Sequence, residues 1–158
     1  MSAQAEMERF AFLVGRYRCD ARLKLPSGEW QRFDALWEGR WILNGRAIAD
    51  DYRMFSAGGE VIVLGLNIRV YDAVKKQWSI KWLDALSGRW TDLGPPELGG
   101  VQFEGTSVSY QFKEPMVGHA LTRATYTNIS ERHFTWKGEG SEDGERWTEF
   151  MVVECERE

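Results

Sequence analysis

Residue types that build metal centres and disulfide frameworks are scarce in this 158-residue sequence, which has only two histidines and two cysteines. Neither histidine has a cysteine or a carboxylate at ligand spacing, so we expect no metal site and no cofactor. Cys19 and Cys155 both fall in alternating strand patterns. This favours two buried free thiols in a reducing, cytoplasmic compartment over a disulfide.

Long apolar runs and basic clusters are also missing. No apolar run approaches the length of about 18 residues that suggests a membrane span, and no basic cluster could follow a phosphate backbone. The first ten residues lack the order of a secretory signal. With 43% apolar residues, 28% charged residues and a net charge of -4, the chain is typical of a water-soluble protein without nucleic-acid or membrane partners. Its length predicts a single domain over residues 1–158.

Alternation of apolar and polar residues is the dominant pattern. In "RYRCDARLKL", Tyr17, Cys19 and Ala21 fall on one face and charged residues on the other, as in a strand with one solvated side. Similar runs recur between turn segments such as "AVKK", "GPPELGG" and "EPMVGH". The one helical pattern is "AQAEMERFAFLVG" near the N-terminus. These features predict an all-β fold, an antiparallel up-and-down barrel or strongly curved half-barrel of about ten strands with a short N-terminal helix.

The segment "RVYDAVKKQWSIKWLDA" predicts the register of one hairpin. A four-residue turn at "AVKK" pairs Tyr71 with Trp78 and Asn67 with Trp82. One face, which we assign to the barrel interior, then carries Asn67, Arg69, Tyr71, Trp78, Ile80, Trp82 and Asp84. The opposite face carries the apolar row of strand 62–70 beside Lys81. This outer row predicts a cover, either the N-terminal helix or the same strand of a second subunit in a homodimer.

Arg69 raises the central question about the interior. An unpaired guanidinium among apolar residues would cost several kcal/mol, so it needs a partner. A structural partner would be Asp84 or a carboxylate of another strand, in an ion pair that plugs the barrel. A functional partner would be an anionic or phenolic group of a ligand, with Trp78 and Trp82 as walls. Both alternatives stay open at this point.

Several motifs together resemble a known family. They are "ERFAFLVGRYRCDARL", "WILNGRAIADDYRMF", "IRVYDAVKKQWSIKWLDALSGRW" and the closing "FTWKGEGSEDGERWTEFMVVECER". In this order and spacing they resemble the uncharacterised bacterial lipocalin-like barrels of the calycin type, over most of residues 8–157. The resemblance implies an antiparallel barrel with an internal cavity, often oligomeric, and no settled activity.

Function follows from the predicted cavity. We expect the barrel to bind a small, mostly apolar or aromatic molecule, whose polar end could be anionic or phenolic. The predicted ligand-binding residues are Asn67, Arg69, Tyr71, Trp78, Trp82, Asp84, Trp37 and Tyr126. One alternative is a cofactor-independent isomerase, cyclase or hydratase, with Asp84 or Asp51 as base and Tyr71 or Tyr126 as acid. Another is a plugged barrel that serves as an assembly module.

Overall fold

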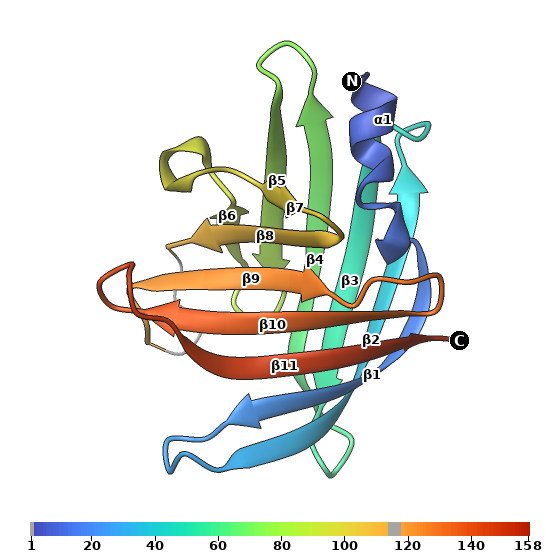
Figure 1. The fold of residues 1–158 in the computed structure, drawn as a ribbon. Coiled ribbons are helices and arrows are strands. Elements are labelled where there is room, and N and C mark those ends of the chain that lie inside the picture. The colour runs from blue at the N-terminus through green and yellow to red at the C-terminus, as the bar shows by residue number, and fades with distance from the viewer. Residues whose placement is uncertain (1, 114–117) are drawn as a thin grey trace.

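Eleven antiparallel strands form one strongly curled sheet, a half-barrel, in a computed structural model that describes residues 2–113 and 118–158 (Figure 1). The strands are β1 (Gly15–Lys24), β2 (Trp30–Ile42), β3 (Ala47–Phe55), β4 (Val61–Asp72), β5 (Gln77–Asp84), β6 (Arg89–Leu93), β7 (Gln102–Glu104), β8 (Ser107–Phe112), β9 (Leu121–Thr127), β10 (His133–Ser141) and β11 (Thr148–Arg157). The helical elements are α1 (Ala3–Glu8) and the short 3-10 turns η1 (Ala11–Leu13) and η2 (Pro96–Leu98). The predicted all-β fold is confirmed. Part of the predicted turn "EPMVGH" lies outside the described residues.

The order across the sheet is β6-β5-β4-β3-β2-β1-β11-β10-β9-β8-β7. Every pair joins strands that follow each other in the sequence except β1 with β11, and the consecutive strands β6 and β7 form the two edges. The two edge strands, β6 and β7, are among the shortest in the sheet. One backbone hydrogen bond, from Gly94 N to Gln111 O at 2.9 Å, links the end of β6 to β8 and helps to close the curl. Short edges of this kind leave few free backbone groups for unwanted pairing.

The predicted hairpin register is confirmed. Tyr71 lies opposite Trp78 and Asn67 opposite Trp82 across β4 and β5. Asn67 and Arg69 are buried on the concave side of the sheet. On the convex side Val70 is 38% exposed, and Lys81 forms a surface ion pair with Asp92.

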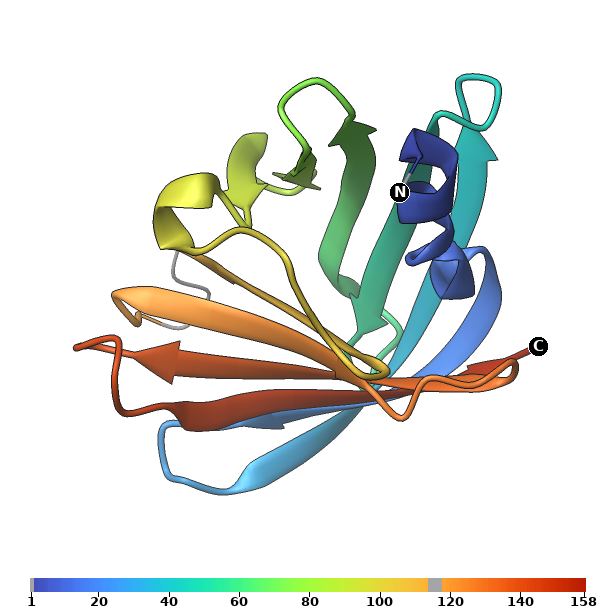
Figure 2. The ribbon, with the colours of Figure 1, turned by 45° about the horizontal axis from the view of Figure 1, so that its top comes forward.

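The N-terminal helix does not cover the outer apolar row of strand 62–70, which was one of the two covers that the sequence predicted. Figures 1 and 2 show α1 at one end of the curled sheet, beside β3 and β4. Met7, Phe10 and Leu13 are buried, and the Phe10 ring meets the rings of the concave side. The helix therefore closes an end of the half-barrel and does not cover the outer row of β4. It ends before its predicted limit, because the chain continues as the 3-10 turn η1. Within the described residues no helix has the length and apolar character needed to cross a membrane.

Candidate functional site

The half-barrel interior has a filled end below α1 and η1. Phe10 is fully buried and packs edge-on against Trp78, with ring centroids 4.9 Å apart, and against Phe103 at 5.8 Å. Phe12 meets Phe134 in the same way at 5.5 Å. Such edge-to-face pairs stabilise a core beyond the area that they bury. This end of the interior is a packed aromatic cluster.

A buried ion pair lies next to that cluster. Arg69 of β4 and Asp50 of β3 both have fully buried side chains, and Arg69 Nε donates to Asp50 Oδ1 at 2.7 Å. Arg69 Nη2 donates to Asp50 Oδ2 at 3.1 Å, which makes the contact bidentate. The guanidinium also stacks over Phe10, 4.8 Å from the ring centroid. Of the predicted structural partners for Arg69, a carboxylate of another strand is correct and Asp84 is wrong.

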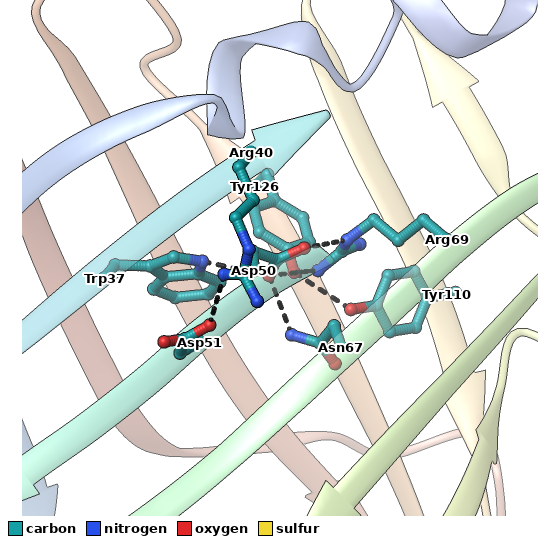
Figure 3. A network of polar contacts seen from close by, with 8 residues as sticks. All are labelled: Trp37, Arg40, Asp50, Asp51, Asn67, Arg69, Tyr110 and Tyr126. Carbon is teal, nitrogen blue, oxygen red and sulfur yellow. Dashed lines mark hydrogen bonds and ion pairs between the residues drawn. The ribbon is translucent and has the colours of Figure 1, made fainter. Parts of the chain in front are cut away.

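Asp50 is the centre of a larger polar network (Figure 3). Besides Arg69, its Oδ2 accepts hydrogen bonds from Trp37 Nε1 at 3.0 Å and from Asn67 Nδ2 at 2.9 Å. Asn67 lies directly opposite Asp50 across β3 and β4. Four donated hydrogen bonds from three side chains occupy the acceptor positions of this carboxylate. Asp50 is therefore held as the counter-ion of Arg69 and has little capacity left for a ligand.

Two tyrosines extend the network across the interior to the other half of the sheet. Arg69 Nη2 donates to Tyr126 Oη at 3.0 Å, and the hydroxyls of Tyr126 and Tyr110 lie 2.9 Å apart. Burial raises the pKa of Tyr126 well above its ordinary value, although the nearby Arg69 charge acts in the opposite direction. Burial alone would lower the pKa of Arg69, but the Asp50 carboxylate reverses this and the pKa stands well above its ordinary value. The network thus pairs the Arg69 guanidinium with the Asp50 carboxylate, and the raised pKa of Tyr126 keeps that hydroxyl neutral.

A cavity of about 290 Å³ occupies the interior on the far side of this network from α1. Its walls are Trp37, Tyr52, Ile62, Val63, Asn67, Trp82, Asp84, Leu86, Arg89, Thr91, Leu93, Tyr110, Phe112, Ala124, Tyr126, Trp136, Met151 and Val153. Tyr126 and Val153 are fully buried, whereas Leu86 is 58% exposed. The cavity therefore runs from a buried inner end to an open end at the β5–β6 turn.

Two glycines allow tryptophan rings to form cavity walls. A Cβ on Gly65 would lie 2.1 Å from the Trp82 ring, and a Cβ on Gly138 would lie 2.8 Å from the Trp136 ring. Both distances are too short for real carbon contacts, so each ring occupies space that only a glycine leaves open. The positions of Trp82 and Trp136 thus depend on Gly65 and Gly138.

Five of the eight predicted ligand-binding residues line this cavity, namely Trp37, Asn67, Trp82, Asp84 and Tyr126. The other three do not. Arg69 belongs to the polar network but does not reach the cavity wall. Tyr71 and Trp78 pack against each other, and Trp78 also contacts Phe10 at the filled end. The sequence placed all of them on the correct face. It could not show where along that face the interior changes from packed to hollow.

Of the two candidate bases, Asp84 lies at the cavity and Asp51 does not. Asp84 lines the open end of the cavity, and its Oδ1 accepts a hydrogen bond from Leu86 N at 2.9 Å. Asp51 points away from the interior and pairs with Arg40 at 2.9 Å on the convex side (Figure 3). The proposal of Asp51 as a base inside the barrel is wrong. Its neighbour Asp50 takes the inward position, because successive strand residues face opposite sides.

Sequence reasoning missed Asp50, Tyr52 and Tyr110. The alternation in β3 contained the necessary signal. In "AIADDYRMF" the charged Arg53 marks the solvent side, which puts Asp50 and Tyr52 on the other face. Tyr110 lies in the alternating segment "SVSYQF" in the same way. A consistent two-residue period across all strands would have identified all three.

Comparison with known proteins gives a fold and no sequence family. No family model matches the chain, and no curated protein matches its sequence. The crystal structure of Rv2717c from M. tuberculosis has a TM-score of 0.67 at 8% identity, covering 96% of each chain. The S-type phycobiliprotein lyase CPES from Guillardia theta has a TM-score of 0.59 at 12% identity, covering 100% of this chain and 93% of that one. The chain has a lipocalin-like β-barrel fold. Membership of the bacterial family that its motifs resemble stays a prediction.

Metal coordination finds no support in residues 2–113 and 118–158, where no three histidine, cysteine, aspartate or glutamate side chains gather in a way that could hold an ion. Cys19 and Cys155 are buried free thiols opposite each other across β1 and β11, and Cys19 Sγ donates to Cys155 Sγ at 3.0 Å. Burial raises the pKa of Cys155, which keeps this thiol protonated and unreactive.

Proposed function

We propose that the protein binds a small, mostly apolar or aromatic molecule in the cavity beside the Asp50 network. The observation that carries this proposal is the hollow of about 290 Å³, since the rest of the interior is closely packed with aromatic rings. Ligand sites of this kind combine apolar walls with a few fixed polar groups. Sequence identities of 8% and 12% to the fold neighbours establish the fold, so the ligand is argued from the cavity alone.

The walls favour a flat ligand. Trp37, Trp82, Trp136 and Phe112 present aromatic surface from four different strands. Contact of an apolar ring with such walls contributes roughly 25 cal/mol per Å² of apolar surface removed from water. The polar groups of the inner end, Asn67 and the two tyrosine hydroxyls of the network, would orient the ligand. Arg69, Tyr71 and Trp78 would support this inner end from behind.

The test uses N-phenyl-1-naphthylamine, an uncharged aromatic probe whose fluorescence rises in apolar surroundings. We expect saturable binding of one probe per chain. Ala124, 1% exposed on the cavity wall, is the position at which to fill the hollow. Ala124→Leu should weaken probe binding at least about tenfold, because the added carbons occupy the space that the probe needs.

The matched control is Thr125→Leu, the next residue of β9, which faces the convex side. It adds similar apolar bulk to the same strand but outside the cavity, so it should leave probe affinity unchanged. Circular dichroism shows whether both variants keep the fold. Failure of the wild-type protein to bind the probe, or equal binding by both variants, would contradict the proposal.

A further inference from the structure

We infer that the cavity selects a flat, uncharged molecule bearing an O–H or N–H donor, and that the side-chain oxygen of Asn67 accepts that hydrogen bond. This inference rests on the proposed ligand binding and specifies the chemistry of the ligand. It combines one free acceptor, which the Asp50 carboxylate orients, with the charge balance of the cavity walls.

Asp50 determines which end of the Asn67 amide is left free. An ionised carboxylate only accepts hydrogen bonds, so it must meet the nitrogen of the amide, and Asn67 Nδ2 donates to Asp50 Oδ2 at 2.9 Å. A flipped amide would place its oxygen against the carboxylate oxygen. The Asn67 oxygen therefore lies on the side of the amide away from Asp50, as Figure 3 shows. On its free side Asn67 presents an acceptor.

The Asn67 oxygen is open to the cavity. Asn67 lines the hollow and is 5% exposed. Within residues 2–113 and 118–158 no donor binds its Oδ1, and this oxygen is not one of the enclosed side-chain atoms that lack a partner. Because Nδ2 donates to a charged group, the amide is polarised and its oxygen is a stronger acceptor. An unpaired oxygen that can be reached inside an apolar hollow is suited to a ligand donor.

Trp82 provides a platform for a flat ligand beside this oxygen. It lies directly opposite Asn67 across β4 and β5. Its ring lies against Gly65, two residues before Asn67 on the same face of β4. Side chains of such cross-strand neighbours are close enough to touch. A ring stacked on Trp82 therefore has an edge next to the Asn67 amide, where an O–H or N–H in the plane of the ring can donate to the oxygen.

The charge balance argues for an uncharged ligand. The Arg69 charge is neutralised by Asp50 within one bidentate contact, and Arg69 does not line the cavity. The charged residues that do line it, Asp84 and Arg89, are cross-strand neighbours of opposite sign at the open end. A carboxylate or an ammonium beside Asn67 would lose its hydration and gain no unshared opposite charge, which is costly in an apolar interior. This replaces the expectation that Arg69 meets an anionic group.

The experiment compares three naphthalenes that share a ring and differ in one substituent. The probes are 2-naphthol with a donor, 2-fluoronaphthalene with nearly the same shape and no donor, and 2-naphthoate with a negative charge. Isothermal titration calorimetry near neutral pH measures their affinities for the wild-type protein. We expect 2-naphthol to bind about 3- to 10-fold more tightly than 2-fluoronaphthalene, the equivalent of one net hydrogen bond. The charged 2-naphthoate should bind most weakly.

Two variants test whether Asn67 is the acceptor. Asn67→Leu removes the amide at similar side-chain size, so the affinity ratio of 2-naphthol to 2-fluoronaphthalene should fall about 3- to 10-fold. The ratio of two probes cancels a general change in cavity shape. Thr91→Val is the matched control, because Thr91 lines the cavity and lies opposite Trp82 from the other side, on β6. Loss of its hydroxyl should leave the ratio unchanged.

The comparison of probes on the wild-type protein decides the donor preference even where Asn67→Leu fails to fold after losing its bond to Asp50. The inference is overturned if 2-fluoronaphthalene or 2-naphthoate binds the wild-type protein as tightly as 2-naphthol does. It is also overturned if folded Asn67→Leu keeps the preference, or if Thr91→Val loses it to the same extent. Equal binding of the two uncharged probes would leave the proposed function intact, whereas binding of none of the three would count against both.

Discussion

Asp50 is the residue that lets a charged side chain lie at the centre of an apolar barrel. Its Oδ2 accepts from Arg69, Trp37 and Asn67, and its Oδ1 accepts from Arg69, so three buried donors hold the carboxylate in place. A buried pair of this kind adds little stability compared with apolar residues of the same size, but removal of one partner leaves an uncompensated charge. Arg69 and Asp50 therefore depend on each other.

This dependence predicts strong coupling between the two residues. Asp50→Asn and Arg69→Met should each lower the free energy of unfolding by about 3–5 kcal/mol, because each leaves one buried charge unpaired. The double variant should lose much less than the sum of the two. Unfolding in guanidinium, followed by tryptophan fluorescence, measures all four proteins of the cycle.

The control for this cycle is the ion pair between Arg40 and Asp51, the residue that follows Asp50 on β3. It has a similar contact distance of 2.9 Å, but the Arg40 side chain is 54% exposed. Arg40→Met should therefore change stability very little, since surface ion pairs are screened by water. Additive losses at Asp50 and Arg69 would refute the view that they form one unit.

The buried tyrosines predict a loss of stability in alkali. Burial raises the pKa values of Tyr52 and Tyr126 above the ordinary value. Above about pH 10 the unfolded chain therefore loses these two protons while the folded protein keeps them. The unfolded state then binds fewer protons, so the free energy of unfolding falls as the pH rises through this range. Below it the contribution is fully present.

The measurement is a titration that follows phenolate absorbance and circular dichroism together. The phenolate signal of Tyr52 and Tyr126 should appear only with the loss of structure, and Tyr52→Phe should reduce the signal that accompanies unfolding. In guanidinium all tyrosines should titrate near their ordinary pKa. Complete ionisation of the tyrosines in a protein that keeps its strand signal would show that these hydroxyls reach solvent.

At the scale of elements, the short helix α1 and the turn η1 decide which end of the interior is filled. Phe10, Leu13 and Met7 are at most 2% exposed. Phe10 contacts Trp78 of β5 and the Arg69 guanidinium of β4, so it joins the N-terminal segment to the polar network. A six-residue helix has little stability of its own and is held in place by this packing.

Phe10→Ala should lower the free energy of unfolding by about 3–5 kcal/mol, the usual cost of removing a buried aromatic ring. The loss should also reduce the affinity for the cavity probe, because the ring supports Arg69 and through it Tyr126. Thermal and chemical unfolding measure the first effect, and probe titration measures the second. Val74→Ala in the β4–β5 turn, where the side chain is 92% exposed, should leave both unchanged.

The elements also show how far the sequence predicts this molecule. The register of β4 and β5 was predictable because a four-residue turn and a two-residue period leave few alternatives. The position of α1 was not predictable, because its apolar side fits either face of the sheet. The Asp50–Arg69 contact required the relative register of β3 and β4, and a register shift at Met54 and Phe55 beside the turn at 56–60 makes that register unreadable from the turn alone. Local patterns thus gave the faces, and only the full sheet gave the partners.

At the scale of the whole molecule, the convex side of β4 to β6 carries an apolar row that α1 leaves uncovered. Val70 is 38% exposed and Trp90 53% exposed, and Leu66, Leu83 and Trp90 lie side by side across the three strands. Exposed apolar surface of this kind is typical of contact regions. The predicted homodimer through the outer face of 62–70 stays a prediction.

Light scattering on the eluting peak of a gel-filtration column tests the predicted homodimer. We expect the wild-type protein to have twice the mass of one chain and Ile68→Lys to have the mass of one chain, because a lysine at the centre of the row cannot be buried without a partner. Lys81→Arg, which keeps the charge beside the row, serves as the control and should remain dimeric. A wild-type protein with the mass of a single chain would rule the dimer out.

The junction between β1 and β11 affects how the protein is made. Seven residue pairs, from Tyr17 with Arg157 to Leu23 with Met151, join the first strand to the last. During synthesis β1 to β6 can pair as successive hairpins, but β1 keeps one open edge until β11 leaves the ribosome. At usual rates of translation that delay is roughly ten seconds. For that time the nascent chain presents the unpaired backbone groups of β1, an edge at which another chain could pair.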